Sequence, residues 1–289
     1  MTKLIGGQSP ATERADKIML LAHGFPGVGK TAFALSFPAP FWVFNLDRAI
    51  GALSTKLPEG HLLDYEAVAI DVDSPTKATA VQYLTRFDKL LNRALTGQIL
   101  DDDGTVITVP KDGTFILDGS DIFWDIVKIA KVNNLDSDLP KEYAPANAYM
   151  NGVLGRLGRS SLNVVFSTIS SKVWTGAKTE SDRVRANGFK HKDRMLTHEV
   201  YMFTPEDRRN PQEVPKGGDA ATPGSTGQTH RAIITMSKLN ESLINRVMPN
   251  LNFGLLYRLT FGMAYPEPER LWSPSAAATA AAKVEVSNA

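Results

Sequence analysis

The stretch that decides the fold is Gly24-Phe25-Pro26-Gly27-Val28-Gly29-Lys30-Thr31, which matches the pattern G-x-x-x-x-G-K-[ST] at every fixed position. The residues before it, Lys17–His23, form a short apolar run typical of a buried parallel strand. The residues after it, Thr31–Phe37, predict a helix that ends at Pro38-Ala39-Pro40. A strand, a glycine-rich turn and a helix in this order predict a phosphate-binding loop.

The residue types in this stretch suit a bound polyphosphate. Glycine lets backbone N–H groups approach the phosphates, which a side chain at the same positions would obstruct. Lys30 supplies a positive charge to the β- and γ-phosphates, and the Thr31 hydroxyl is a ligand for Mg²⁺. We therefore expect Gly24–Thr31 to bind ATP with Mg²⁺. The alternative is a glycine-rich strand-to-helix turn with an exposed lysine.

Apolar runs alternate with amphipathic stretches beyond this loop. Further buried strands are predicted at Phe41–Leu46, Ala67–Val72, Thr114–Leu117 and Asn163–Ser167. Helices, with apolar residues every three or four positions, are predicted at Thr76–Leu100, Ile122–Val132 and Ala144–Leu157. Turn signals around Thr105–Val109 predict a hairpin. Strands alternating with helices predict an α/β fold, with a mostly parallel twisted sheet and helices on both faces.

The part of the chain after Asn163–Ser167 combines strand-like segments with long loops. Strand-like segments lie at Val200–Phe203, Ala232–Met236 and Leu255–Phe261. Long loops, rich in charge, proline or glycine, are predicted at residues 171–195 and 205–230. Two terminal segments lack apolar bulk and are predicted to be flexible or disordered, the arm 1–15 and the Ala-rich tail 273–289. We therefore expect one main domain over residues 16–272.

The composition of the 289-residue chain excludes several classes of protein. The chain has no cysteine, which rules out disulfides and zinc–thiolate sites and fits a reducing cytoplasm. Its five histidines are scattered, without metal-ligand spacing. No apolar run approaches the ~18 residues that a membrane span needs. The net charge is +1, so any nucleic-acid surface must be local. We expect a cytoplasmic protein that does not bind membranes.

A carboxylate at the end of a predicted strand is a candidate magnesium ligand. Asp118 follows Thr114–Leu117, and a carboxylate at the tip of a buried strand beside a phosphate loop can hold the water shell of Mg²⁺. The alternative is a cap for the helix at Ile122–Val132. We expect Asp121, which is closer to that helix, to be the cap.

Two more polar residues follow predicted strands. Asp47 could orient and deprotonate the water that attacks the γ-phosphate, or it could pair with Arg48 at the surface. Thr168 could sense the γ-phosphate and signal to the loop that follows. Alternatively, the Thr168 hydroxyl is buried and bonded to a neighbouring strand.

The order of these features resembles the RecA-type recombinase core, and in particular the short RecA-like ATP-binding proteins of bacteriophages that act in single-strand annealing and recombination. The resemblance covers Lys17–Phe261. Besides the phosphate loop, it rests on three segments: Trp42–Asp47, where that family places a hydrolytic acidic residue; Phe115–Ser120, as the Walker B strand; and Asn163–Thr168, which leads into a DNA-binding loop. It implies a RecA-like ATPase that forms a homo-oligomeric ring or filament, with ATP at subunit interfaces.

This chain departs from the RecA family at two positions of the site and resembles it at a third, where the family has a residue that acts between subunits. RecA proteins usually carry Glu where this chain has Asp47, and the shorter Asp predicts slow hydrolysis. They carry Gln where this chain has Thr168. Lys238 matches the late strand that presents basic residues to ATP on the neighbouring subunit, where it would stabilise γ-phosphate charge. The alternative for Lys238 is a surface lysine.

A basic stretch follows Thr168, where the resemblance places DNA contacts. Seven basic residues outnumber three acidic ones there, and such a surplus attracts a phosphate backbone without reading its sequence. The basic residues are Lys172, Lys178, Arg183, Arg185, Lys190, Lys192 and Arg194. Trp174 and Phe189 are expected to stack on unpaired bases. The stretch predicts binding of single-stranded DNA, and the alternative is a solvated charged loop.

Three functions are compatible with these features. The first is a DNA recombination or annealing protein that binds single-stranded DNA and hydrolyses ATP in response. The second is a helicase or helicase loader, although nothing in the sequence resembles the additional translocating or docking elements of such proteins. The third is a P-loop nucleotide kinase, in which Arg183, Arg185 and Arg194 could form a lid. We expect the first.

Overall fold

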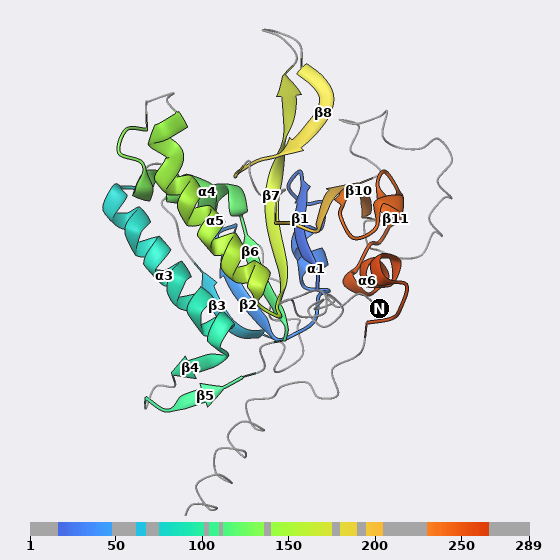
Figure 1. Cartoon of the computed structure of the whole chain (residues 1–289). Coiled ribbons are helices and arrows are strands. Elements are labelled where there is room, and N and C mark those ends of the chain that lie inside the picture. The colour runs from blue at the N-terminus through green and yellow to red at the C-terminus, as the bar shows by residue number, and fades with distance from the viewer. Residues whose placement is uncertain are drawn as a thin grey trace, which may run out of the picture.

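The fold is given by a computed structural model of the 289-residue chain (Figure 1). The described residues are 17–47, 62–67, 75–100, 104–109, 112–135, 140–174, 180–189, 195–204 and 230–265. The predicted arm 1–15 and tail 273–289 lie outside them. Of the predicted loop 205–230, only His230 is described.

A central sheet contains most of the strands (Figure 1). Its strands are β1 (Met19–Gly24), β2 (Phe41–Asn45), β3 (Leu62–Ala67), β6 (Thr114–Asp118), β7 (Asn163–Trp174), β8 (Glu180–Ala186), β9 (His198–Phe203), β10 (Arg231–Ser237) and β11 (Val247–Pro249). Their order is β11-β10-β9-β1-β7-β6-β2-β3, with β8 paired to β7. Every pair from β9 to β3 is parallel, whereas β8, β10 and β11 pair antiparallel. The sheet is mostly parallel, as predicted.

The described helices lie on both faces of this sheet. They are α1 (Lys30–Ala34), α3 (Lys77–Thr96), α4 (Ser120–Lys131), α5 (Ala144–Arg159) and α6 (Phe253–Phe261), with short 3-10 turns at Pro140–Tyr143 and Glu241–Leu243. The predicted hairpin follows α3 and consists of β4 (Gln98–Leu100) and β5 (Val106–Thr108). None of the described helices is both long and apolar enough to cross a membrane.

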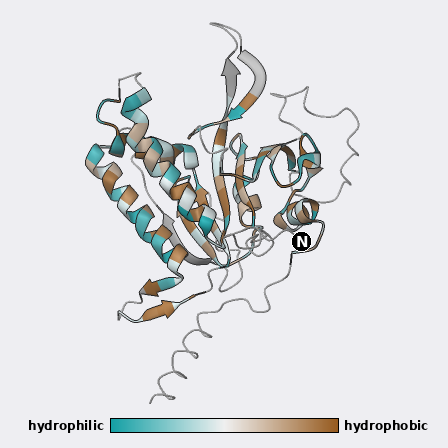
Figure 2. Cartoon of the chain, in the orientation of Figure 1, coloured by the Kyte–Doolittle hydropathy of each residue, from teal (hydrophilic) through white to brown (hydrophobic). Residues whose placement is uncertain are grey.

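The side chains of β1 alternate between two hydrophobic cores. Met19 and Leu21 pack into the core beneath α3, α4 and α5, whereas Leu20 and Ala22 pack into the core beneath α1 and α6. Both faces of the strand are therefore buried, which explains why its sequence is continuously apolar instead of alternating. Figure 2 shows apolar residues concentrated in the central strands, while polar and apolar residues alternate along α3 and α5. The α/β class with helices on both faces is confirmed.

The register of the parallel strands brings their carboxyl ends to one edge of the sheet. Gly24, the last residue of β1, is opposite Ile169 of β7. Asp118, the last residue of β6, is opposite Asn45 on one side and Ser167 on the other. The phosphate loop and the residues after β2 and β6 therefore meet at the same edge, which is where ligands bind in open α/β sheets.

The segment Leu255–Phe261 is helical, which corrects the prediction of a strand. It belongs to α6, whose buried residues are Phe253, Leu256, Tyr257 and Thr260, and this spacing is helical. The Asn252 side chain accepts a hydrogen bond from the Leu255 N–H at the start of α6, and Gly262 ends the helix in a left-handed conformation. The short apolar run suits a strand or a helix equally, and these caps decide between them.

The predicted strand Ala67–Val72 and the predicted loop 171–195 compare differently with the structure. The described strand after β2 is Leu62–Ala67, and of the predicted strand only Ala67, which is part of it, lies within the described residues. The predicted loop 171–195 begins instead with strand: β7 continues to Trp174, and β8 pairs with it antiparallel. Strand pairing provides hydrogen-bond partners for this polar backbone, so the segment extends the sheet without an apolar sequence.

Candidate nucleotide-binding site

The loop Gly24–Thr31 joins β1 to α1, the strand-to-helix context that its motif predicts. Gly27 and Gly29 have φ angles of 83° and 90°, in the left-handed region that favours glycine. Helix α1 begins at Lys30, within the loop, and the Phe33 N–H donates to the Gly29 carbonyl at 2.9 Å. The loop thus has the tight glycine turns that a phosphate cradle requires.

Strand β9 packs directly against the start of the loop. A Cβ atom on Gly24 would lie 2.3 Å from the Met202 carbonyl oxygen and 2.8 Å from Cγ2 of Val28. Both distances are far inside van der Waals contact, and the Met202 oxygen belongs to backbone that the sheet holds in place. Gly24 is therefore required by the packing of β9 as well as by any bound phosphate.

The Lys30 side chain lies inside the loop. It is only 6% exposed, and its Nζ donates to the carbonyl oxygens of Gly24 at 3.1 Å and Phe25 at 3.0 Å. Burial lowers the pKa of Lys30, and the nearby carboxylates of Asp47, Asp118 and Asp121 act in the opposite direction. The ammonium group is thus held at the loop by backbone carbonyls, which an arriving phosphate can replace as its partner.

Asp118 and Thr31 lie next to each other, as a shared magnesium site requires. The Thr31 hydroxyl donates to Oδ2 of Asp118 at 3.4 Å, and both residues are buried. Burial is the main cause that raises the pKa of Asp118, and the neighbouring Asp47 raises it further. A nearby cation would stabilise the ionised form of a carboxylate whose pKa is raised in this way. A hydroxyl and a carboxylate are also the donors that Mg²⁺ takes when phosphates complete its shell.

Ser167 supports Asp118 and was missed by sequence reasoning. Its hydroxyl donates to Oδ1 of Asp118 and accepts from the Gly119 N–H at 3.1 Å. The hydrogen bond from Ser167 to Asp118 is the strongest of the interactions that lower the pKa of Asp118. The only signal in the sequence was a polar residue at the end of an apolar strand. Ser167 orients the carboxylate so that Oδ2 faces Thr31.

Asp47 is close enough to Lys30 and Asp118 to interact with both electrostatically. It is exposed and directly follows Leu46, whose N–H donates to the Asp118 carbonyl at 2.9 Å. Its negative charge acts on both Lys30 and Asp118. The alternative partner, Arg48, lies outside the described residues. The role of Asp47 in orienting water stays a prediction.

Asp121 is part of this group of carboxylates, and the prediction that it caps α4 was wrong. The N-cap residue is Gly119, which has no side-chain bond, and Asp121 lies within the first turn. Burial is the main cause that raises the pKa of Asp121. Hydrogen bonds from its own N–H and from Ile122, together with the Thr168 hydroxyl, act to lower it. The charges of three carboxylates, Asp47, Asp118 and Asp121, therefore act on Lys30, whereas sequence reasoning had assigned only Asp47 and Asp118 to the site.

Thr168 and Lys238 lie where their strands predict, but their functional roles are untested. The Thr168 side chain is 1% exposed, with its hydroxyl 3.4 Å from the carbonyl oxygens of Ile169 and Asn187. Lys238 directly follows β10 and is exposed, and its backbone N–H donates to the Thr197 carbonyl at 2.9 Å. Sensing by Thr168 and action of Lys238 in a neighbouring subunit stay predictions.

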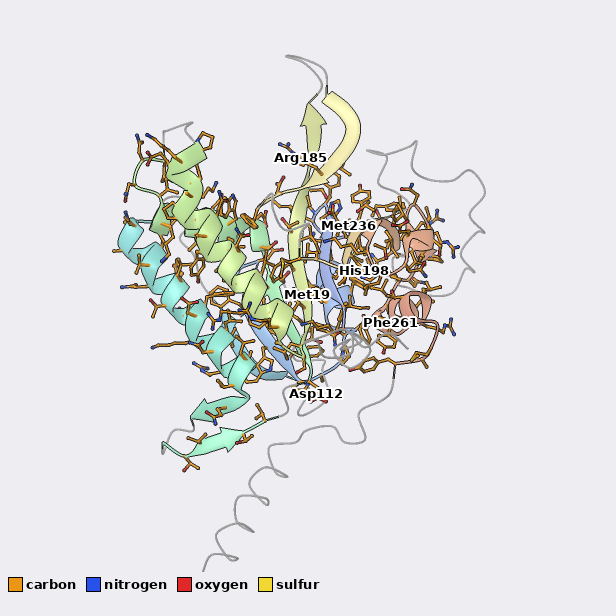
Figure 3. The ribbon with its side chains drawn as sticks, viewed as in Figure 1. Met19, Asp112, Arg185, His198, Met236 and Phe261 are labelled. Atoms are coloured by element: carbon orange, nitrogen blue, oxygen red, sulfur yellow. The ribbon has the colours of Figure 1, made fainter. Side chains whose placement is uncertain are left out.

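The basic stretch is partly a hairpin. Lys172, Trp174 and Arg183 lie on β7 and β8, although the positions of their side chains are outside the description. Arg185 is exposed on β8 (Figure 3), and with Asp121 it lines an open cavity of about 700 Å³. The remaining basic residues lie outside the described residues: Lys178, Lys190, Lys192 and Arg194.

Phe189 is not available to stack on bases, which corrects the prediction for this residue. It is 4% exposed and belongs to the core beneath α4, where its ring lies 5.1 Å from that of Trp124. The apolar ring is more stable in this core than in water, so it anchors the end of the hairpin to the body of the protein.

Comparisons with known proteins add little to this geometry. No family model matches the sequence, and no curated protein matches it. Among solved structures, a KaiC-like protein from the hyperthermophilic archaeon Pyrococcus horikoshii is similar, with 12% identity over 80% of this chain and 84% of that chain and a TM-score of 0.36. The functional assignment therefore depends on the loop and the residues around it.

Proposed function

We propose that this chain binds ATP with Mg²⁺ and hydrolyses it as a RecA-like ATPase. The observation that carries the proposal is the group formed by buried Lys30, Thr31 and Asp118, in which the Thr31 hydroxyl lies 3.4 Å from the Asp118 carboxylate beside a glycine loop. The chemistry of these donors fits Mg²⁺ with a polyphosphate. When bound, Mg²⁺ would neutralise charge that develops on the phosphates.

Each residue of the group has a distinct part in this proposal. Lys30 exchanges its two carbonyl partners for phosphate oxygens, which are better partners for a partly desolvated ammonium. Thr31 and Asp118 hold the metal, with Asp118 oriented by Ser167. Asp47, exposed at the same edge, orients the attacking water. Because Asp reaches less far than Glu, we expect slow turnover.

We further propose that ATP binding serves single-stranded DNA recombination or annealing. Support comes from the basic stretch, from exposed Arg185, and from β7, which runs from Ser167 beside Asp118 into the hairpin. A positive surface of this kind attracts a nucleic-acid backbone irrespective of sequence. In a homo-oligomer on DNA, Lys238 would act on ATP bound to the neighbouring copy.

The experiment that tests the proposal is ATP hydrolysis with and without single-stranded DNA, on the wild type and on Lys30→Ala. We expect slow Mg²⁺-dependent hydrolysis that DNA accelerates and that Lys30→Ala lowers by roughly a hundredfold or more. Hydrolysis that requires a nucleoside monophosphate acceptor and ignores DNA would favour the kinase. Strand displacement coupled to hydrolysis would favour the helicase. Absence of any binding of Mg²⁺-ATP by the wild type would reject the whole proposal.

A further inference from the structure

His230 lies flat against the phosphate loop. A Cβ atom built on Gly29 would be 3.0 Å from each of three ring atoms of His230: Cγ, Cδ2 and Cε1. Because these atoms are equally distant and spread around the ring, the built point lies over the ring face. The imidazole therefore stacks on Gly29, the residue directly before Lys30.

The position of His230 is fixed by the sheet. Its carbonyl accepts from the Asn250 N–H at 2.8 Å. The next residue, Arg231, pairs with Phe203 of β9 on one side and Pro249 of β11 on the other. The same strand β9 contacts Gly24 at the other end of the loop, through the Met202 carbonyl. Strand β9 and His230, the residue directly before β10, thus contact the two ends of the glycine loop.

One ring nitrogen of His230 makes no hydrogen bond within the described part of the chain. Nδ1 of His230 is buried and has no hydrogen-bond partner among the described residues. Buried polar atoms in native proteins nearly always have a partner, so an exception at a ligand site calls for one that arrives with the ligand. Phosphate oxygens are strong acceptors, and Lys30, next to Gly29, is the residue that binds them in the proposed function.

We propose that His230 is a nucleotide-binding residue, whose Nδ1–H donates a hydrogen bond to a phosphate oxygen while its ring supports Gly29. This inference rests on the proposed nucleotide binding. The χ2 torsion of histidine is soft, so the ring can rotate against Gly29 when a ligand arrives. Donation requires either the Nδ1–H tautomer or the imidazolium.

The test is titration calorimetry with two probes, Mg²⁺-ADP and Mg²⁺-pyrophosphate, on folded variants. His230→Phe keeps a flat ring but removes Nδ1, and His230→Asn keeps a polar donor on a shorter side chain. Leu239→Ala, an exposed position just after β10, is the matched control. We expect His230→Phe to lower the affinity for both probes by about tenfold and His230→Asn to lower it less. Leu239→Ala should leave both affinities unchanged.

Two outcomes would overturn this role for His230. In one, His230→Phe binds both probes like the wild type, so the ring only packs. In the other, His230→Phe lowers the affinity for Mg²⁺-ADP but not for Mg²⁺-pyrophosphate, which would mean that His230 contacts the nucleoside. If His230→Phe does not fold, the ¹⁵N resonance of His230 Nδ1 in the wild type decides: it must shift when pyrophosphate saturates the protein. Binding that depends on Lys30 but not on His230 rejects only this inference, whereas wild type that binds neither probe rejects the proposed function too.

Discussion

The phosphate loop and the β7–β8 hairpin are neighbours, because β1 pairs with β7, yet they depend on different physics. In the loop, one buried lysine is held by backbone carbonyls and attracted by nearby carboxylates, and a side chain at Gly24 or Gly29 would collide with Met202 or His230. On the hairpin, Arg185 is exposed to water. Water screens an exposed charge, so the hairpin can act only through the sum of several charges. Single changes should therefore matter greatly in the loop and little on the hairpin.

The largest expected effect is that of Lys30→Ala. Removing the buried ammonium takes a cation from the proposed phosphates and removes the positive charge that interacts with Asp47, Asp118 and Asp121. We expect ATP turnover to fall by roughly a hundredfold or more. The measurement is steady-state phosphate release, with circular dichroism as the control for folding. Retention of full turnover in a folded variant would remove the basis for the contrast between the two regions.

The next effect is on stability, through Gly24→Ala. The added methyl group would lie 2.3 Å from the Met202 carbonyl oxygen, so β9 or the loop must move. We expect a loss of about 2 kcal/mol in the free energy of unfolding, measured by urea denaturation. Gly152→Ala is the matched control, because Gly152 is in α5 and a Cβ atom built on it would have no atom within 4 Å apart from the helix's own nearby backbone. That change should be neutral or stabilising by about 0.5–1 kcal/mol.

A smaller effect concerns the pH dependence of activity in Ser167→Ala. The Ser167 hydroxyl lowers the pKa of Asp118, so its removal raises that pKa further. Asp118 must be ionised to hold Mg²⁺, and the acid limb of the pH–rate profile should therefore move to higher pH. Turnover at alkaline pH should change little, and Ser167→Thr should restore the profile. An unchanged acid limb in Ser167→Ala would mean that Asp118 does not hold the metal.

The smallest effect is expected on the hairpin, from Arg185→Glu. One reversed charge among several should weaken single-stranded DNA binding only a few-fold and reduce the salt dependence of binding by about one phosphate contact. ATP binding without DNA should be unchanged. Arg258→Glu, at an exposed position of α6, is the control. If Arg185→Glu abolished DNA binding altogether, the hairpin would be a built site like the loop, and the contrast drawn above would fail.

The parts of the site that sequence reasoning found are those with strict local requirements. Gly24–Thr31 follows from a motif, and Asp118 follows from its place at the end of a buried strand. Ser167 and Asp121 were missed or misassigned because their roles depend on contacts between β6, β7 and α4. His230 was placed in a loop, and nothing in its local sequence shows that it contacts Gly29.

The fold shows the same division. Continuous apolar runs identified β1, β2 and β6, because strands buried on both faces need them. The extension of β7 and the strand β8 were missed, because polar residues form strand there by pairing with each other. The helix α6 was taken for a strand, because a short apolar run fits both and only its caps and packing decide.

The sequence by itself determined a glycine-rich loop between a buried strand and a helix, and with it the α/β class, since those features depend on backbone conformation and residue type over a few positions. Tertiary structure alone decided what surrounds the loop: Ser167 on Asp118, Met202 against Gly24 and His230 on Gly29. These contacts join residues far apart in the chain. They follow from the order and register of the strands, which no local pattern encodes.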